Sequence, residues 1–396
     1  SLRLSGALFL CLFCTRALAE GQLRVANTAH YRVHTDLEPQ LADDLTQRME
    51  RMYQQYSLRL ADFNPRQSAP FEVYLFRQRS DYATLTSDRY PTTGGIFIPR
   101  RNILAGFLEG QGRDALRRTL QHEAFHQFAF MAIGPEMPVW LNEGIAQVFE
   151  EGLWTGTQFR IGQVPPRRMR QLKQDLAQRR FMPFKDFIAI TDEQWRNDLR
   201  DGVLGAARYD QAWAMTHFLI FAIGMDGQPL YRSRLTQMLK LVEAGQKPGD
   251  AFLKTFSDNF DGFESRFMEY ARALRPTPEA VYVEYQGILA DMIAQIGSRG
   301  QRFDDPDALR QYLTDGSVRL RYTKGDVQWS TETDPMAYFR DDKGRLMTHE
   351  QLYFSLRGGA PYPDIVCCPI NGITLRTIFH DELGEKIDHE TVIEAK

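Results

Sequence analysis

The segment 114–133 constrains the fold more than any other, because its apolar residues recur at spacings of three and four. This spacing predicts an amphipathic helix with one face in a core, and Asp114 is a suitable N-cap. Gly134-Pro135 ends this helix, and a second helix is predicted over about 138–152. The connection between them is short, so we expect the two helices to pack against each other.

Length and composition indicate a folded protein. The chain has 396 residues, of which 43% are hydrophobic, and this excludes a disordered chain and suggests two domains. Its 48 Lys and Arg residues are matched by 51 Asp and Glu residues. No basic stripe is present, so we expect no nucleic-acid partner.

The first nineteen residues are typical of a secretory signal peptide. Arg3 precedes an apolar run at 6–14, and the small-residue pattern at 17–19 predicts cleavage before Glu20. We therefore expect export to the periplasm or the medium. The longest later apolar run, 217–225, is shorter than the ~20 residues that span a bilayer, so no transmembrane span is expected in the mature chain.

The remaining pattern predicts an α+β protein in two domains. Strands are expected at 23–36 and 71–76, a strand pair at 96–98 and 102–107, and helices at 41–60, 169–177, 209–223, 230–244, 248–256, 260–274 and 279–296. Further strands are expected at 318–322, 327–330, 337–341, 352–356 and 373–379. The composition changes near Arg275-Pro276, so we place one domain at 20–275 and a small α+β or β-rich domain of unknown role at 276–396.

The best predicted helix contains HEAFH at 122–126, an H-E-x-x-H sequence. Its helical spacing puts His122 and His126 one turn apart on one face, so both imidazoles can reach one metal ion. Neutral imidazole suits Zn²⁺, whose catalytic sites use three protein ligands and a water. Glu123 can lie over that water and take its proton without binding the metal.

The second helix carries the sequence WLNEGIA at 140–146. It places Glu143 seventeen positions after His126, across the Gly-Pro turn. Gly144 permits a close approach between helices, and Glu143 can complete the ligand set.

Together, HEAFH and WLNEGIA resemble the gluzincin metallopeptidases, specifically the exported bacterial proteins called peptidase MA-like. The resemblance covers about residues 25–275 and implies a small mixed sheet with a helix-rich lobe. It implies that His122, His126 and Glu143 bind one zinc ion and that Glu123 is the catalytic general base. It also implies a peptide or protein substrate. The gap from His126 to Glu143 is a little shorter than in the best-known gluzincins.

Gluzincins also place a Tyr or His on a downstream helix, where it stabilises the oxyanion of the tetrahedral intermediate. Tyr209, at the start of YDQAWAMTHFLIF, is similar in position and local sequence, and His217 is its competitor. The strand after Gly94-Gly95 resembles the edge strand that pairs with substrate in these enzymes. The Gly-x-Met-x-Asn signature of the related aminopeptidases is absent, so an endopeptidase fits better.

Two other functions stay open at this point. The chain could be a catalytically inactive, zinc-containing binding or envelope module, with the C-terminal domain carrying recognition, or a zinc hydrolase acting on another amide. Glu123 discriminates the enzyme from the inactive module, because only the enzyme needs its carboxylate.

A few residues have ordinary structural explanations. His30 and His34 share one side of a predicted strand but are interpreted as structural histidines, and Cys367 and Cys368 as two buried thiols. Glu150, two turns beyond Glu143, could hold a ligand in place.

Overall fold

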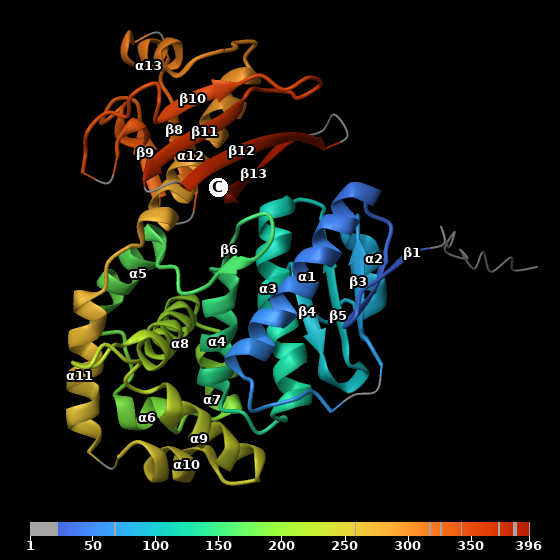
Figure 1. The fold of residues 1–396 in the computed structure, drawn as a ribbon, viewed down its shortest axis with the longest axis vertical. Helices are drawn as coiled ribbons and strands as arrows, with labels where there is room; N and C mark the ends of the chain where they lie inside the picture. The colour runs from blue at the N-terminus through green and yellow to red at the C-terminus, as the bar shows by residue number, and fades with distance from the viewer. Residues whose placement is uncertain are drawn as a thin grey trace, which may run out of the picture.

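The computed structural model describes residues 23–66, 69–257, 259–316, 318–324, 327–341, 343–370, 373–382 and 386–395. The predicted signal peptide at 1–19 lies outside these residues. The fold is mixed α+β, with many helices and several small sheets (Figure 1). Within the described residues, no helix is both long and apolar enough to cross a membrane.

A five-stranded mixed sheet forms the N-terminal part. Its strands are β1 (Arg24–Asn27), β2 (Tyr31–Thr35), β3 (Phe71–Phe76), β4 (Gly95–Ile98) and β5 (Ile103–Phe107), in the order β1-β2-β3-β5-β4. The central pairs β2–β3 and β3–β5 are parallel, while β1 and β4 are antiparallel additions at the two edges. The order leaves β4 at an edge of the sheet.

Helices cover both faces of this sheet. Parallel neighbours need crossover connections, and α1 (Pro39–Arg59) supplies the one between β2 and β3. With α3 (Arg113–Ala132) it packs on one face, where Tyr56 and Phe125 meet edge to face. On the other face α2 (Arg79–Thr86) buries Tyr82 against Phe107. A short 3₁₀ turn, η1 (Pro99–Arg101), links β4 to β5.

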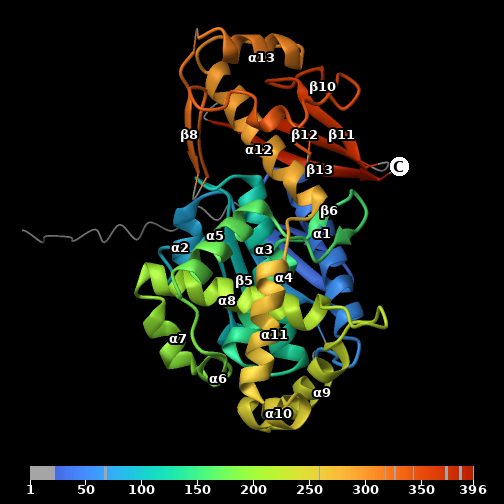
Figure 2. The ribbon, with the colours of Figure 1, turned by 90° about the vertical axis from the view of Figure 1, so that its left-hand side faces the viewer.

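A helix-rich lobe follows the sheet. It contains α4 (Val139–Glu150), α5 (Pro166–Ala177), α6 (Phe184–Ile188), α7 (Asp192–Asp198), α8 (Gly202–Phe221), α9 (Arg232–Glu243), α10 (Pro248–Thr255) and α11 (Phe260–Ala273), with a hairpin of β6 (Leu153–Trp154) and β7 (Phe159–Arg160). The long helix α8 runs through the middle of the lobe, beside α4 (Figures 1 and 2). Its buried residues come from all sides of the helix, which is why it is a central element.

The C-terminal part is a four-stranded antiparallel sheet with one long helix on it. Its elements are α12 (Pro278–Gly297), α13 (Pro306–Thr314), β8 (Arg321–Lys324), β9 (Val327–Ser330), η2 (Ala337–Phe339), β10 (Leu352–Ser355), β11 (Asp364–Ile370), β12 (Ile373–Glu382) and β13 (Lys386–Ala395). The sheet order is β10-β11-β12-β13, and β8 and β9 form a separate pair. We call the described part of residues 278–395 the C-terminal module.

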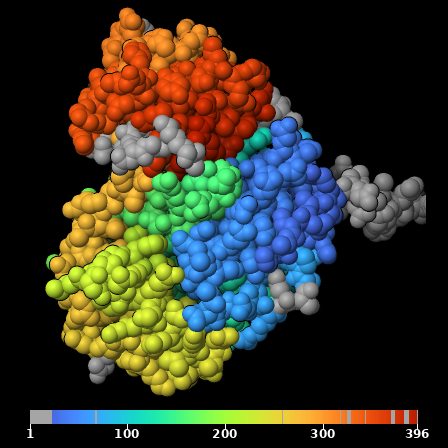
Figure 3. All heavy atoms as spheres, in the orientation of Figure 1, coloured from blue at the N-terminus to red at the C-terminus, as the bar shows by residue number. Residues whose placement is uncertain are grey.

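Two large apolar cores correspond to these parts. One includes residues between Tyr31 and Ala271, and the other includes residues between Tyr282 and Ile393. The domain boundary predicted at 275/276 falls between these ranges and stays a prediction. Strand β13 of the C-terminal module contacts β6 and α3, and the module lies against the segment around β6 in Figure 3.

The structure differs from the sequence predictions in several elements. The strand predicted at 23–36 is two strands, because a turn at residues 28–30 folds β1 back onto β2. Helix α8 begins at Gly202, well before the predicted start at 209, and Asp201 caps it. Helix α13 and strands β11 and β13 were not predicted as such, and 337–339 is a 3₁₀ turn instead of a strand. The pair β4–β5 is confirmed.

Candidate metal centre

Helix α3 has one face buried in the core and another face that carries the two histidines. Leu120, Ala124 and Phe128 are buried in the larger core. His122 and His126 point away from that core, one turn apart, with ring centroids 4.7 Å from each other. The helical repeat therefore fixes the histidine pair once the apolar face is buried.

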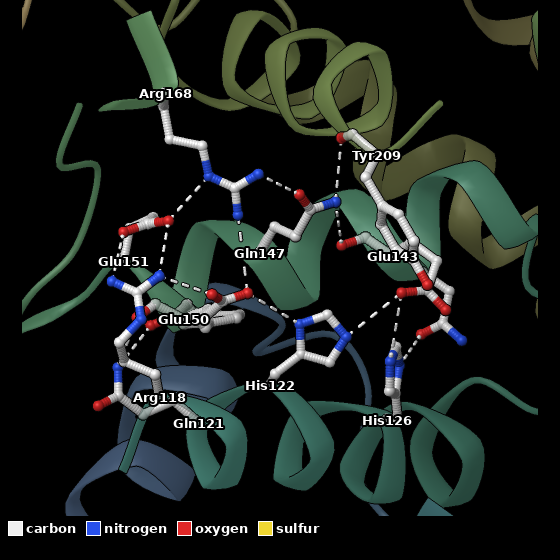
Figure 4. A network of polar contacts seen from close by, with 12 residues as sticks. Arg118, Gln121, His122, His126, Glu143, Gln147, Glu150, Glu151, Arg168 and Tyr209 are labelled. Carbon is white, nitrogen blue, oxygen red and sulfur yellow. Dashed lines mark hydrogen bonds and ion pairs between the residues drawn. The ribbon is translucent and has the colours of Figure 1, made fainter. Parts of the chain in front are cut away.

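Helix α4 brings the third side chain by packing closely against α8. Gly144 makes this possible, because a Cβ atom there would lie 2.2 Å from Thr216 Oγ1 and 2.4 Å from the carbonyl oxygen of Ala212. Trp140 and Leu141 bury the start of α4 in the core. Glu143 then faces the histidines of α3 (Figure 4).

Three ligand atoms converge at this point. His122 Nε2 lies 3.3 Å from Glu143 Oε2, and His126 Nε2 lies 3.6 Å from the same oxygen. The three side chains offer ligand atoms that lie within 4.8 Å of one another. In the described part of the chain, no other His, Cys, Asp and Glu side chains form such a group. Glu143 Oε2 is buried, and the nearest nitrogens are the two imidazole Nε2 atoms, which are also the atoms that would share a metal ion with it.

The Nδ1 atom of each imidazole also has a hydrogen-bond partner. His122 Nδ1 lies 3.2 Å from Glu150 Oε2, and His126 Nδ1 lies 3.1 Å from Asn142 Oδ1. In the neutral imidazole, an acceptor at Nδ1 holds the proton there, so that Nε2 has a free lone pair to offer to a metal ion. Glu150, which the sequence offered only as a residue that could hold a ligand in place, thus contacts His122.

The charges within the cluster shift its pKa values in opposite directions. Burial lowers the pKa of both imidazoles, but the hydrogen bonds and charge of Glu143 outweigh it, and both pKa values are raised. Burial raises the pKa of Glu143, but the charge of His126 and the hydrogen bond with His122 hold it well below its ordinary range. Glu143 is therefore ionised at neutral pH.

Half-buried arginines surround Glu150 and its buried neighbour Glu151. Arg118 Nη2 lies 2.6 Å from Glu150 Oε1 and 3.1 Å from Glu151 Oε1, and Arg168 Nε lies 2.8 Å from Glu151 Oε1. Burial raises the pKa of Glu151, but the charges of Arg118, Arg167 and Arg168 lower it to about 2. The arginines keep both carboxylates ionised, so Glu150 can accept the imidazole N–H of His122.

The Glu123 carboxylate is directed at the edge of the sheet and not at Glu143. Its Oε2 accepts a hydrogen bond of 2.8 Å from the backbone N–H of Phe97 in β4. Phe97 in turn packs on Phe130 of α3, with ring centroids 5.7 Å apart. One backbone donor thus orients the carboxylate beside the two histidines.

Tyr209 reaches the centre from α8. Its ring extends toward Glu143 (Figure 4), and the ring of Trp195 packs edge-on against it at 5.3 Å. Burial, with the charges of Glu143 and Glu123, raises the pKa of the phenol, so it keeps its proton at neutral pH. Gln147 connects the two helices, because its amide donates to the carbonyl oxygens of Tyr209 (3.1 Å) and Glu143 (3.3 Å).

The other candidate histidines lie elsewhere. His217 is buried, and its Nδ1 lies 2.7 Å from the hydroxyl of Tyr270. His30 and His34 each pair with a different carboxylate, Glu50 and Glu72, at 2.7 Å. These contacts agree with the structural interpretation of His30 and His34. Of the two thiols, Cys367 is buried, Cys368 is half-buried, and both are free.

Sequence reasoning missed Asn142, Gln147 and the arginines. Asn142 directly precedes Glu143, so its place in the motif was a usable signal. Arg118 and Arg168 gave none, because their partners come from other helices.

A protein family described as "Protein of unknown function (DUF1570)" matches residues 117–223. The matched segment begins in α3 and ends just after α8, so it contains the metal-binding candidates and Tyr209. It covers less than half of the chain. No curated protein was found to match.

Proposed function

We propose that this chain is an exported zinc-dependent peptidase of the gluzincin type, with an endopeptidase activity. The observation that carries the proposal is the convergence of His122, His126 and Glu143, with ligand atoms within 4.8 Å of one another and Glu123 beside them. The resemblance of HEAFH and WLNEGIA to peptidase MA-like proteins supports the same function.

The donor set fits zinc. Two imidazole nitrogens and one carboxylate oxygen are a known ligand set of catalytic zinc, whereas Ca²⁺ and Mg²⁺ prefer oxygen ligands. The acceptors at both Nδ1 atoms, Glu150 and Asn142, are the supporting contacts that metal-binding histidines require. Zinc held by these three side chains would supply a Lewis acid that polarises a substrate carbonyl and acidifies a water molecule.

Glu123 is the general base in this proposal. Its carboxylate takes a proton from the attacking water and delivers it to the leaving amine. The hydrogen bond from Phe97 N–H fixes the orientation of the carboxylate, so little motion is needed when the proton moves.

Two further elements suit a peptide substrate. The Tyr209 hydroxyl keeps its proton and can donate a hydrogen bond to the oxyanion of the tetrahedral intermediate. Strand β4 is an edge strand next to Glu123, and an extended peptide can add to such an edge through backbone hydrogen bonds.

The test combines metal content with one carboxylate-to-amide substitution. We expect about one zinc per chain in the purified protein, lost in His126→Ala. Glu123→Gln should retain the zinc but lose peptide hydrolysis by roughly 10²–10⁴-fold, the usual range for a general base. Glu136→Gln is the matched control, because Glu136 is exposed in the turn between α3 and α4.

The outcomes separate the competing functions. A protein without zinc under metal-replete conditions would exclude the metallopeptidase. If wild type and Glu123→Gln both bind zinc and do not differ in peptide hydrolysis, the inactive zinc-containing module is favoured instead. Hydrolysis of a non-peptide amide alone, still dependent on Glu123, would identify a zinc hydrolase of another class.

A further inference from the structure

Strand β13 of the C-terminal module contacts the beginning of the metal-binding helix α3. Asp388 Oδ2 accepts a hydrogen bond of 2.5 Å from the backbone N–H of Arg113, the first residue of α3. The N-cap residue of this helix is Gly112, with φ of +85°, so the expectation that Asp114 caps the helix is wrong: Asp114 lies inside the first turn, and no side chain of the helix end makes a cap hydrogen bond. Asp388 therefore supplies, from 275 residues further along the chain, the side-chain cap that this helix end lacks.

A second carboxylate of β13 binds the same helix one turn later. Glu390 forms ion pairs with Arg117 of α3 and, at 3.3 Å, with Arg48 of α1. Asp44 completes the group, 2.9 Å from Arg117 and 2.8 Å from Arg48. The side chains of Arg117 and Glu390 are only 4% and 9% exposed, so this contact is shielded from water and salt.

The chemistry of Glu390 keeps this contact charged. His380 Nε2 lies 2.8 Å from Glu390 Oε1, on the neighbouring strand. Burial raises the pKa of Glu390, but the hydrogen bond with His380 and the charges of Arg117 and Arg48 lower it to about 2. The carboxylate is thus ionised at every pH at which the protein would work.

These contacts lie directly before the metal-binding residues on one rigid helix. Arg117 is five residues, about 7.5 Å along the helix axis, from His122. The next residue, Arg118, forms an ion pair with Glu150 at the end of α4, and Glu150 contacts His122. The first turns of α3 are therefore clamped between β13 and the end of α4, and His122 lies at the end of the clamped segment.

We propose that Asp388 and Glu390 are positioning residues for the metal centre: β13 fixes the start of α3 and thereby the place of His122 relative to Glu143. The C-terminal module is then a structural part of the metal centre instead of a separate recognition module. This inference rests on the metal binding in the proposed function.

The test compares three variants of the full chain. Asp388→Ala removes the cap, and Glu390→Gln removes the buried charge. Glu394→Gln is the matched control on the same strand, because Glu394 pairs with Arg376 of β12 and is 43% exposed. The zinc dissociation constant is measured by chelator competition at a temperature at which circular dichroism shows every variant to be folded.

We expect Glu390→Gln and Asp388→Ala to weaken zinc binding by about tenfold or more, the effect known for supporting residues of metal sites. Glu394→Gln should stay within about twofold of wild type. Hydrogen exchange of the metal-free protein gives an independent readout, in which both variants should exchange faster along α3 as far as His122. If Glu390→Gln does not fold, hydrogen exchange along α3 is compared between wild type and Asp388→Ala alone.

The two proposals fail in different ways. If the wild type binds zinc and both variants bind it equally well, with only a lower melting temperature, β13 stabilises the fold and does not position the site. Faster exchange confined to the first turn of α3 would overturn the inference too. If the wild type binds no zinc, the proposed function itself is wrong, and the positioning role falls with it.

Discussion

Burial decides the charge state of His217. Its ring is 4% exposed and bonded to Tyr270, and burial lowers its pKa to about 4, although the carbonyl of Gly162 opposes the shift. A histidine with an ordinary pKa of about 6.5 in the unfolded chain takes up a proton there first. The folded state is therefore favoured above pH 6.5, and this contribution is lost as the pH falls toward 4.

This pH dependence can be measured directly. Between pH 7.5 and 4.5, His217 should cost the metal-free protein roughly 2–3 kcal/mol of unfolding free energy, from 1.4 kcal/mol per pKa unit. Urea unfolding of wild type and His217→Gln at both pH values gives the comparison, and the variant should lose less stability on acidification. An equal loss in both proteins would show that His217 is not buried in its neutral form.

Part of the candidate site could be predicted from the sequence. His122 and His126 are joined by helical spacing, and Glu143 by a short turn, so local rules sufficed to group them. Their support could not be foreseen: Arg118 and Asp388 act on partners from other elements, and burial of a charge depends on those partners. Metal binding by the group stays a prediction.

Helices α4 and α8 meet at Gly144 without a side chain between them. A Cβ atom would contact Thr216 Oγ1 and the Ala212 carbonyl at 2.2 and 2.4 Å, so one of the helices must move. We expect Gly144→Ala to destabilise the fold by about 1–3 kcal/mol, as for overpacked cores, and to weaken zinc binding because Glu143 is adjacent.

The control for this prediction lies on the partner helix. Gly202 begins α8, and a Cβ atom there would meet nothing within 4 Å, so Gly202→Ala should be neutral or slightly stabilising. Urea unfolding and chelator competition on both variants provide the measurement. Equal behaviour of the two alanine variants would mean that the close approach of α4 and α8 is not required.

Helices were easier to foresee than strands, for a physical reason. The spacing of apolar residues in α1, α3 and α11 is a local property, and the predicted bounds differ from the observed ones by a few residues at most. Strands β11 and β13 lack a clean alternation, since Cys367 and Cys368 are adjacent in one and polar residues dominate the other. What makes them strands is pairing with β12, which no local pattern reports.

Hydrogen bonds and an ion pair join the regions of the two apolar cores, in addition to the chain itself. Arg167 N–H donates to Glu284 at 2.9 Å, and Thr277 N–H donates to the carbonyl of Val164 at 3.0 Å. Glu390 adds the buried contact with Arg117. If one core unfolded while the other stayed folded, these groups would remain buried without partners. Each unpaired neutral group would then cost about 1–3 kcal/mol of free energy, and an unpaired charge would cost more.

We therefore expect the two cores to unfold in one transition that depends on zinc. A ligand that binds only the folded state at 100 times its dissociation constant adds about 2.7 kcal/mol, so zinc should raise the melting temperature by a few degrees, and a chelator should reverse the rise. Scanning calorimetry should show one peak whose calorimetric and van't Hoff enthalpies agree. Two peaks, of which zinc moves only one, would instead mean that the C-terminal module unfolds by itself and that its contacts with α3 are too weak to fix the position of that helix.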